Sequence, residues 1–281
     1  MTTKLLGALA LCAAVCGSMS ANADVTSANT VGFQAKTVAA DTWYMLAPQF
    51  NGVAANSDEE IDLLKVLSVS GITPQAYAAA TAASICTQIQ VYENGGYTPY
   101  YYINNGRRTG DPQTGSLIGW GKNRTLANEI KIKPYQGFWV KVVSVGDNPQ
   151  ITFAGEVRDA ATTVVPITGS AEGNWSICNN PYPVAAKFSD IVVTDIVPQA
   201  YAAATAANLC TQIQVYENGG YTPYYYINNG RQTGVEGTGS LVGWGKNRTL
   251  FLNDFVQPGQ SFWIKAYSSG SLTFKFPGVD K

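Results

Sequence analysis

The sequence predicts an all-β fold with minor short helices, built as two tandem β-sandwich-like domains that arose by internal duplication. Two features indicate this. Pro74–Leu126 recurs as Pro198–Leu250 at a constant offset, 198 − 74 = 124, and only seven positions differ. Most of the remaining segments are short, rich in β-branched and aromatic residues, and bounded by Gly, Pro, Asn or Asp, which is typical of strands. A long repeat of this kind indicates two similar folding units.

The repeat extends beyond the near-identical block. Tyr135–Lys141 (YQGFWVK) matches Gly259–Lys265 (GQSFWIK) at the same offset. The six tryptophans also form three pairs, which are Trp43/Trp175, Trp120/Trp244 and Trp139/Trp263. We therefore expect a first β repeat at 24–158 and a second at 159–281, each large enough to hold its own core.

The first 23 residues read as a signal peptide. Lys4 precedes an apolar run, Leu5–Cys16, and small residues at Ala21–Ala23 form a cleavage site before Asp24. The run is too short to span a bilayer comfortably, and no later stretch approaches the length of a membrane span. We therefore expect a chain that is exported, located outside the cell or on its surface, and not transmembrane.

Seven segments of the first repeat are expected to be strands. They are Thr30–Val38, Trp43–Ala47, Thr87–Glu93, Tyr97–Asn104, Glu129–Lys133, Gly137–Val143 and Gln150–Val157. Two short helices are expected to interrupt them. One follows a capping box at Ser57–Glu60 and covers Ile61–Val66. The other starts at Thr73-Pro74, with proline at its first position. The second repeat is shortened around the first of these helices, which is expected to be stunted or absent there.

The hairpin that turns at Asn94–Gly96 has two possible registers, and a slip by one residue exchanges the faces of the sheet. A three-residue loop pairs Glu93 with Tyr97 and places Tyr100 and Tyr102 on the face opposite Ile89 and Val91. A two-residue turn, which Asn-Gly favours, places both tyrosines on the face of Ile89 and Val91. The sequence favours the longer loop, because this loop gathers the clearly apolar residues on one side.

Composition excludes several classes of function. The chain has 18 basic and 19 acidic residues, so neither sign dominates and a nucleic-acid-binding surface is not expected. It has no histidine, which excludes His-based catalysis and His metal ligands. The duplicated block keeps one acid in both copies, Glu93/Glu217, whereas a glycosidase needs two facing carboxylates. No phosphate loop or nucleophile elbow occurs. We expect no enzymatic activity, no cofactor and no metal site.

The cysteines leave two alternatives open. Cys86 and Cys210 are equivalent in the two repeats, and Cys178 aligns with Leu46. A Cys178–Cys210 disulfide is compatible with an oxidising compartment. Buried free thiols that pack as small apolar residues are the other alternative.

The candidate binding surface is a cluster of aromatic residues that occurs in both repeats. Exposed rings beside amide and guanidinium donors can bind sugar rings or another protein surface. The alternative is that the tyrosines are half-buried sheet residues. Trp120 and Trp244 lie between glycines, where an exposed ring and a buried ring are equally compatible with the sequence. In contrast, the other four tryptophans are expected to pack in the cores. The candidate binding residues are Tyr97, Tyr100, Tyr102, Asn105, Arg107 and Trp120, with their equivalents Tyr221, Tyr224, Tyr226, Asn229, Arg231 and Trp244.

Three motifs of the second repeat resemble a β module found in many exported, surface-associated bacterial proteins of unknown function. They are the tryptophan strand ending in Asn-Pro-Tyr-Pro at 175–183, the hairpin at Ile213–Tyr221, and Pro258–Ala266 (PGQSFWIKA). The first repeat departs from the pattern, with Ala47–Phe50 in place of Asn-Pro-Tyr-Pro. The resemblance implies a β-sandwich-like fold and export, and it brings no catalytic residues with it.

The sequence therefore predicts a non-enzymatic secreted or cell-surface protein with a structural or adhesive role. Two copies of one Tyr-rich surface gain affinity through effective concentration. The same duplication suits self-association, because a surface that joins the two repeats can also join two chains. The alternative function is a carbohydrate-binding module that holds an extracellular glycan with exposed Tyr and Trp side chains.

Overall fold

The computed structural model describes residues 31–50, 59–93, 95–110, 115, 117–158, 160–217, 219–232, 241–251 and 255–275. The expected signal peptide and Ser57 lie outside these residues. The chain from Val31 onward forms one compact unit. In the described part of the chain, no helix is long and apolar enough to cross a membrane.

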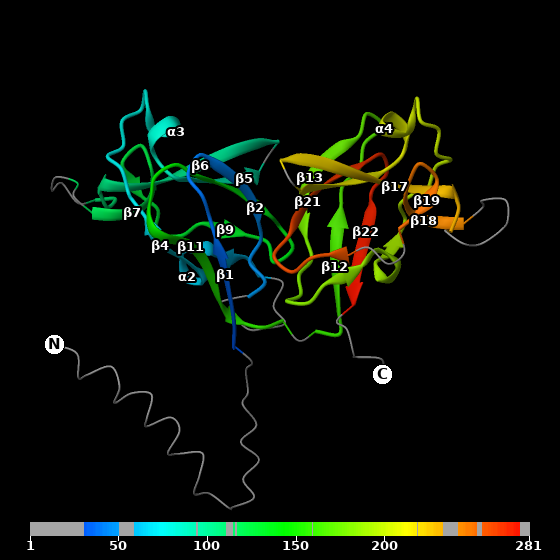
Figure 1. Cartoon of the computed structure of the whole chain (residues 1–281), viewed down its shortest axis with the longest axis horizontal. Coiled ribbons are helices and arrows are strands. Elements are labelled where there is room, and N and C mark those ends of the chain that lie inside the picture. The colour runs from blue at the N-terminus through cyan, green and yellow to red at the C-terminus, as the bar shows by residue number, and fades with distance from the viewer. Residues whose placement is uncertain are drawn as a thin grey trace, which may run out of the picture. The chain divides into compact units, whose positions relative to one another are not determined.

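The all-β fold predicted from the sequence is confirmed (Figure 1). The strands of the first half are β1 (Val31–Thr37), β2 (Thr42–Leu46), β3 (Ile61–Asp62), β4 (Leu67–Ile72), β5 (Gln88–Glu93), β6 (Gly96–Gly106), β7 (Leu117–Lys122), β8 (Thr125–Leu126), β9 (Lys131–Ile132), β10 (Phe138–Val142) and β11 (Val145–Glu156). Those of the second half are β12 (Thr162–Ile167), β13 (Asn174–Asn179), β14 (Ala186–Lys187), β15 (Val192–Thr194), β16 (Gln212–Glu217), β17 (Gly220–Gly230), β18 (Leu241–Lys246), β19 (Thr249–Leu250), β20 (Phe255–Val256), β21 (Ser261–Ala266) and β22 (Gly270–Lys275).

Each half holds a six-stranded and a three-stranded antiparallel sheet. In the first half the strand orders are β2-β10-β5-β6-β7-β8 and β1-β11-β4. In the second half they are β13-β21-β16-β17-β18-β19 and β12-β22-β15. The two orders match strand for strand, as the internal duplication requires. The boundary expected at 158/159 falls between β11 and β12.

Each half also has its own apolar core between its two sheets. In the first half Phe138 of the larger sheet packs on Phe153 of the smaller sheet, with ring centroids 6.1 Å apart and planes at 70°. Phe262 and Phe274 are fully buried at the equivalent positions of the second core. Alternation along each strand explains this, because every second side chain faces the partner sheet.

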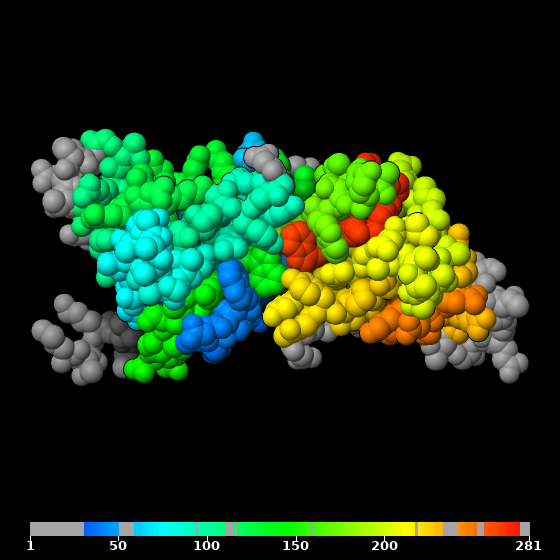
Figure 2. All heavy atoms as spheres, turned by 90° about the horizontal axis from the view of Figure 1, so that it is seen from above, coloured from blue at the N-terminus to red at the C-terminus, as the bar shows by residue number. Residues whose placement is uncertain are grey.

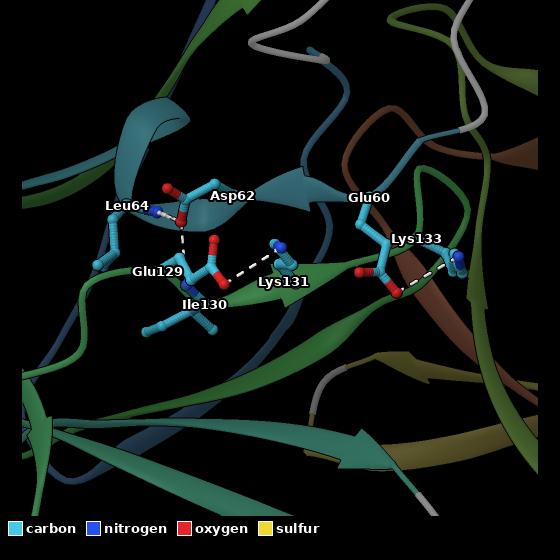
Figure 3. Close-up of polar contacts among 7 residues, drawn as sticks. All are labelled: Glu60, Asp62, Leu64, Glu129, Ile130, Lys131 and Lys133. Atoms are coloured by element: carbon cyan, nitrogen blue, oxygen red, sulfur yellow. Dashed lines mark hydrogen bonds and ion pairs between the residues drawn. The ribbon is translucent and has the colours of Figure 1, made fainter.

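The helices differ from the sequence-based expectation. The helix expected at Ile61–Val66 is shorter, α2 (Leu63–Val66), and its N-cap is Asp62 rather than Ser57. Asp62 Oδ1 accepts hydrogen bonds from the backbone N–H groups of Leu64 at 3.1 Å and Ile130 at 3.0 Å (Figure 3). The preceding Ile61–Asp62 pairs with β9 instead, so the strand pairing displaces the start of the helix. A Lys133–Glu60 ion pair of 3.3 Å closes the same corner.

The other helices lie later in the chain than expected. The Ala-rich segment forms α3 (Ala82–Ile85), not a helix that starts at Pro74, and its copy is α4 (Ala206–Leu209). The second repeat has only the 3-10 turn η1 (Phe188–Asp190) in the shortened region, which confirms the expected loss of a helix there.

The β5–β6 hairpin has a two-residue turn, so the prediction of a three-residue loop is wrong. Glu93 pairs with Gly96, which leaves two residues between the strands. Gly95 has φ +78°, a conformation that suits glycine in a tight turn. Ile89 therefore faces Tyr100 across the ladder, and both Tyr100 and Tyr102 pack against the core.

The three cysteines that the structure describes, Cys86, Cys178 and Cys210, are free and buried, so the Cys178–Cys210 disulfide is not present and the alternative of buried thiols is confirmed. Cys178 lies in the second core, whereas Cys210 packs with Ala206 and Ile227 on the other side of the sheet. In addition, β21 separates β13 from β16 in the strand order. A disulfide would require neighbouring Cβ atoms that this topology keeps apart.

Candidate functional site

Four tryptophans lie on the outer face of the six-stranded sheets, and the expectation that they pack in the cores is wrong. In β10 the core side takes Phe138, Val140 and Val142, so Trp139 points to the opposite face. The ladder places Trp139 beside Met45 of β2 and Gln90 of β5. Trp139 shares its face with Lys141, so the alternation along β10 marks this face as the outer one.

The outer faces of the two repeats contact each other through these rings. Trp139 of the first repeat packs on Tyr216 of the second, with centroids 5.4 Å apart and planes at 75°. Trp263 of the second repeat packs on Tyr92 of the first in the same way, at 5.4 Å and 77°. Because Trp139/Trp263 and Tyr92/Tyr216 are equivalent pairs, the same contact forms twice with the roles of the repeats exchanged. This is an isologous, pseudo-two-fold interface.

The backbone follows the same symmetry. Leu46 forms an isolated β-bridge with Gln260, and Cys178 forms one with Gln136. Leu46 and Cys178 occupy equivalent positions, as do Gln136 and Gln260. The two repeats are therefore joined by two bridges that are copies of each other.

Two aromatic pockets open along this interface. Pocket A has a volume of about 290 Å³ and is lined by Trp43, Gln90, Tyr97, Trp139, Tyr216 and Tyr221. Pocket B has a volume of about 350 Å³ and is lined by Tyr92, Tyr97, Trp175, Gln214, Tyr221 and Trp263. Each residue of pocket A has its equivalent in pocket B. Figure 2 shows a face of the molecule on which the β5–β6 hairpin (teal) and the β16–β17 hairpin (yellow) are both visible.

The indoles in each pocket are set edge to face. Trp43 and Trp139 have centroids 6.0 Å apart and planes at 89°, and Trp175 and Trp263 repeat this at 5.8 Å and 84°. Trp43, Trp175 and Trp263 are half-buried, so part of each ring is open to solvent. Such rings offer flat apolar faces, with polar edges, to a ligand.

Tyr97 and Tyr221 line both pockets and are 43% and 46% exposed. Desolvation of the hydroxyl raises the pKa of Tyr97 to about 12, although a hydrogen bond with Trp139 opposes the shift. Desolvation also raises the pKa of Tyr221, although a hydrogen bond with Trp263 opposes the shift. Both hydroxyls are therefore neutral at neutral pH.

Each pocket also contains a glutamine and has a lysine near it. Gln90 Nε2 donates to Gln88 Oε1 at 2.9 Å, and Gln214 Nε2 donates to Gln212 Oε1 at 3.1 Å. A primary amide has two donors and a carbonyl oxygen, so bonding capacity remains for a ligand. The Nζ of Lys141 lies 5.9 Å from the centroid of the Trp43 ring, and Lys265 lies 5.8 Å from that of Trp175.

Most of the other sequence-predicted site residues do not reach the pockets. Tyr102 and Tyr226 pack on Trp120 and Trp244 at 5.1 and 5.2 Å, inside the cores. The two tryptophans are only 8% and 2% exposed, so a binding role as exposed rings is excluded for them. Tyr100 and Tyr224 are also half-buried against the cores, because the two-residue turn places them on the core face.

The polar members of the predicted site have structural contacts. Asn105 Oδ1 accepts from the backbone N–H of Tyr77 at 2.8 Å, and Asn229 accepts from Tyr201 at 2.8 Å. Arg107 and Arg231 are exposed and belong to isolated bridges with Thr125 and Thr249, away from the residues that line pockets A and B. Of the twelve candidates, only Tyr97 and Tyr221 line the two pockets.

The pocket residues that were not predicted from the sequence share one signal. Gln90 and Tyr92 alternate with the core residues Ile89 and Val91 along β5, so they define its outer face once the register is known. Tryptophans at repeat-equivalent positions on the neighbouring strands complete that face. No family model matches the chain, and no curated protein matches it.

Proposed function

We propose that this protein is a non-enzymatic, extracellular glycan-binding protein that acts as an adhesin or matrix component and holds sugar rings in pockets A and B. One observation carries the proposal, namely that the same set of Trp, Tyr and Gln side chains lines two equivalent pockets. Sugar rings have apolar C–H faces and hydroxyl edges. Half-exposed aromatic rings beside amides complement both.

The charges around the pockets support recognition of a neutral or acidic glycan. The described residues that line pockets A and B include no carboxylate, imidazole or thiol. The nearby charges are the ammonium groups of Lys141 and Lys265. Polar groups that are uncharged and fixed by neighbours orient a ligand without a large desolvation cost.

The contact between the repeats favours glycan binding over end-to-end assembly. An isologous contact closes on itself, because each repeat uses the patch that its partner also uses. The surface that would have joined one chain to the next is therefore occupied within the chain. What remains open on that face is the pair of pockets, held at a fixed spacing, which gives bivalent binding.

Binding to an array of extracellular polysaccharides and oligosaccharides, followed by titration of tryptophan fluorescence, tests the proposal. A Gln90→Ala/Gln214→Ala double variant should bind its best glycan about tenfold more weakly or worse, as expected for the loss of one hydrogen bond per site. Gln199→Ala changes an exposed glutamine outside the pockets and serves as the matched control. Absence of binding to every glycan on the array would overturn the proposal.

A further inference from the structure

A third cavity, with a volume of about 520 Å³, adjoins pocket A. Trp43 and Tyr216 line both spaces, so the two adjoin at these rings. The rest of the cavity lies between strands β1 and β2 of the first repeat and the turn Gln257–Gln260 of the second repeat.

A difference between the repeats explains why this cavity exists. In the first repeat the turn equivalent to Gln257–Gln260 carries Tyr135, whose ring packs against the core of the second repeat. The backbone N–H of Asn179 also donates to the carbonyl of Tyr135 at 3.0 Å. The residue equivalent to Tyr135 is Gly259, which has φ +68° and no side chain. The cavity beside pocket A is thus on the side where the turn carries Gly259 in place of a tyrosine.

Three glutamine side chains line the cavity, together with aromatic and aliphatic side chains and Lys36. Gln34 Nε2 donates to the carbonyl of Pro258 at 3.4 Å, which holds the side chain across the space. The Oε1 atom of Gln34 is buried and has no hydrogen-bond partner among the residues that the structure describes. Gln257 and Gln260 also line the space, and the described residues of its lining include no carboxylate. A buried carbonyl oxygen without a partner is unfavourable unless a ligand or water satisfies it.

We infer that this amide-lined cavity is a further sugar subsite that lengthens pocket A, so that pocket A takes a linear oligosaccharide while pocket B takes a shorter unit. The inference rests on the proposed function and names the class of ligand more closely. Trp43 and Tyr216 stand at the junction, where one ring of the chain stacks. The next ring enters the cavity, where its hydroxyls meet Gln34 Oε1 and the neighbouring amides.

The test uses ladders of cello-, chito- and manno-oligosaccharides, from disaccharide to hexasaccharide, titrated into the full chain with tryptophan fluorescence as the readout. Affinity should rise about tenfold or more as the chain lengthens enough to enter the cavity, which corresponds to one or two added hydrogen bonds. Gln34→Phe fills the cavity and Gln34→Ala removes its amide. Both variants should abolish the gain with length and leave disaccharide affinity unchanged. Thr37→Ala, an exposed change on the same strand outside the lining, is the control.

The outcomes separate the inference from the proposed function. If no ladder and no array glycan binds, the proposed function fails and the inference fails with it. If glycans bind but affinity does not depend on length, or the Gln34 variants keep the full gain with length, the proposed function stands and the subsite is refuted. Urea unfolding of both Gln34 variants shows whether they fold, and Gln34→Ala provides the decisive comparison if Gln34→Phe does not.

Discussion

Gly137 and Ser261 occupy the same position in the two repeats, and they face each other across the interface. A Cβ atom on Gly137 would overlap with Ser261 Oγ and lie 2.7 Å from Ile177 Cγ2. Ser261 Oγ in turn donates to the carbonyl of Leu46 at 2.7 Å. A residue that meets its own counterpart marks the pseudo-two-fold axis, and here one of the two must have no side chain.

Gly137→Ala is expected to destabilise the protein by about 1–3 kcal/mol, because the added methyl group overpacks the axis. Urea unfolding monitored by fluorescence measures the change. Gly243→Ala is the matched control, since a Cβ at that strand position would lie at an ordinary 3.5 Å from Leu250 Cδ2. Ser261→Gly should restore part of the loss in a double variant, with a coupling of about 0.5 kcal/mol or more. Additive effects of the two substitutions would contradict the axial contact.

Stability is expected to fall as the pH rises from about 10 towards 12. The pKa of Tyr97 is raised by desolvation to about 12 in the folded chain, whereas an unfolded tyrosine titrates near 10. The unfolded state therefore loses its proton first, and the stability that is fully present below pH 10 is lost as the pH approaches the folded value. Denaturant midpoints measured across this range test the effect. Tyr97→Phe should flatten the decline, and an unchanged slope would refute the assignment to Tyr97.

The thiols are expected to be unreactive in the folded protein. Burial raises the pKa of Cys178 to about 12, and burial also raises the pKa of Cys86 and Cys210. Because the thiolate is the reactive form, these three side chains should resist a thiol reagent until the chain unfolds. The unfolding midpoint should also be the same with and without a reductant. A Cys178–Cys210 crosslinked peptide in a non-reducing digest would contradict the structure.

Asp62→Ala should cost about 1–2 kcal/mol, because one carboxylate oxygen caps α2 and also accepts from Ile130. Thermal or urea unfolding measures the loss. Asp190→Ala is a suitable comparison, since in the described part of the chain the carboxylate of Asp190 accepts a hydrogen bond from the hydroxyl of its exposed neighbour Ser189. Equal stability of the two variants would show that the Asp62 cap is not important.

Much of the fold was predictable because it depends on local patterns. Short β-prone segments bounded by turn residues identified the seven expected strands of the first repeat. Strands β4 and β7 were missed because Leu67–Ile72 and Leu117–Lys122 contain serine or glycine at alternate positions. The capping box at Ser57–Glu60 was misleading, since pairing of Ile61 with Ile132 overrode it.

The site was less predictable because it depends on register and on contacts between the repeats. The choice between a two- and a three-residue turn decided whether Tyr100 or Tyr101 faced the core, and the sequence contained signals for both. Trp139 and Trp263 were predicted as core residues because their neighbours in sequence are apolar, although alternation places them on the faces of Lys141 and Lys265. Their outer faces meet the other repeat, and no pattern within one repeat can show that.

Covalent linkage of two copies has freed the positions on the axis to diverge. Two identical chains in a symmetric dimer would have to carry the same residue at every self-facing position, so a change at one would always be a change at both. Within a single chain, Gly137 can differ from Ser261, and Tyr135 can differ from Gly259. In a tandem fusion, equivalent positions of the two repeats can therefore be substituted independently of each other.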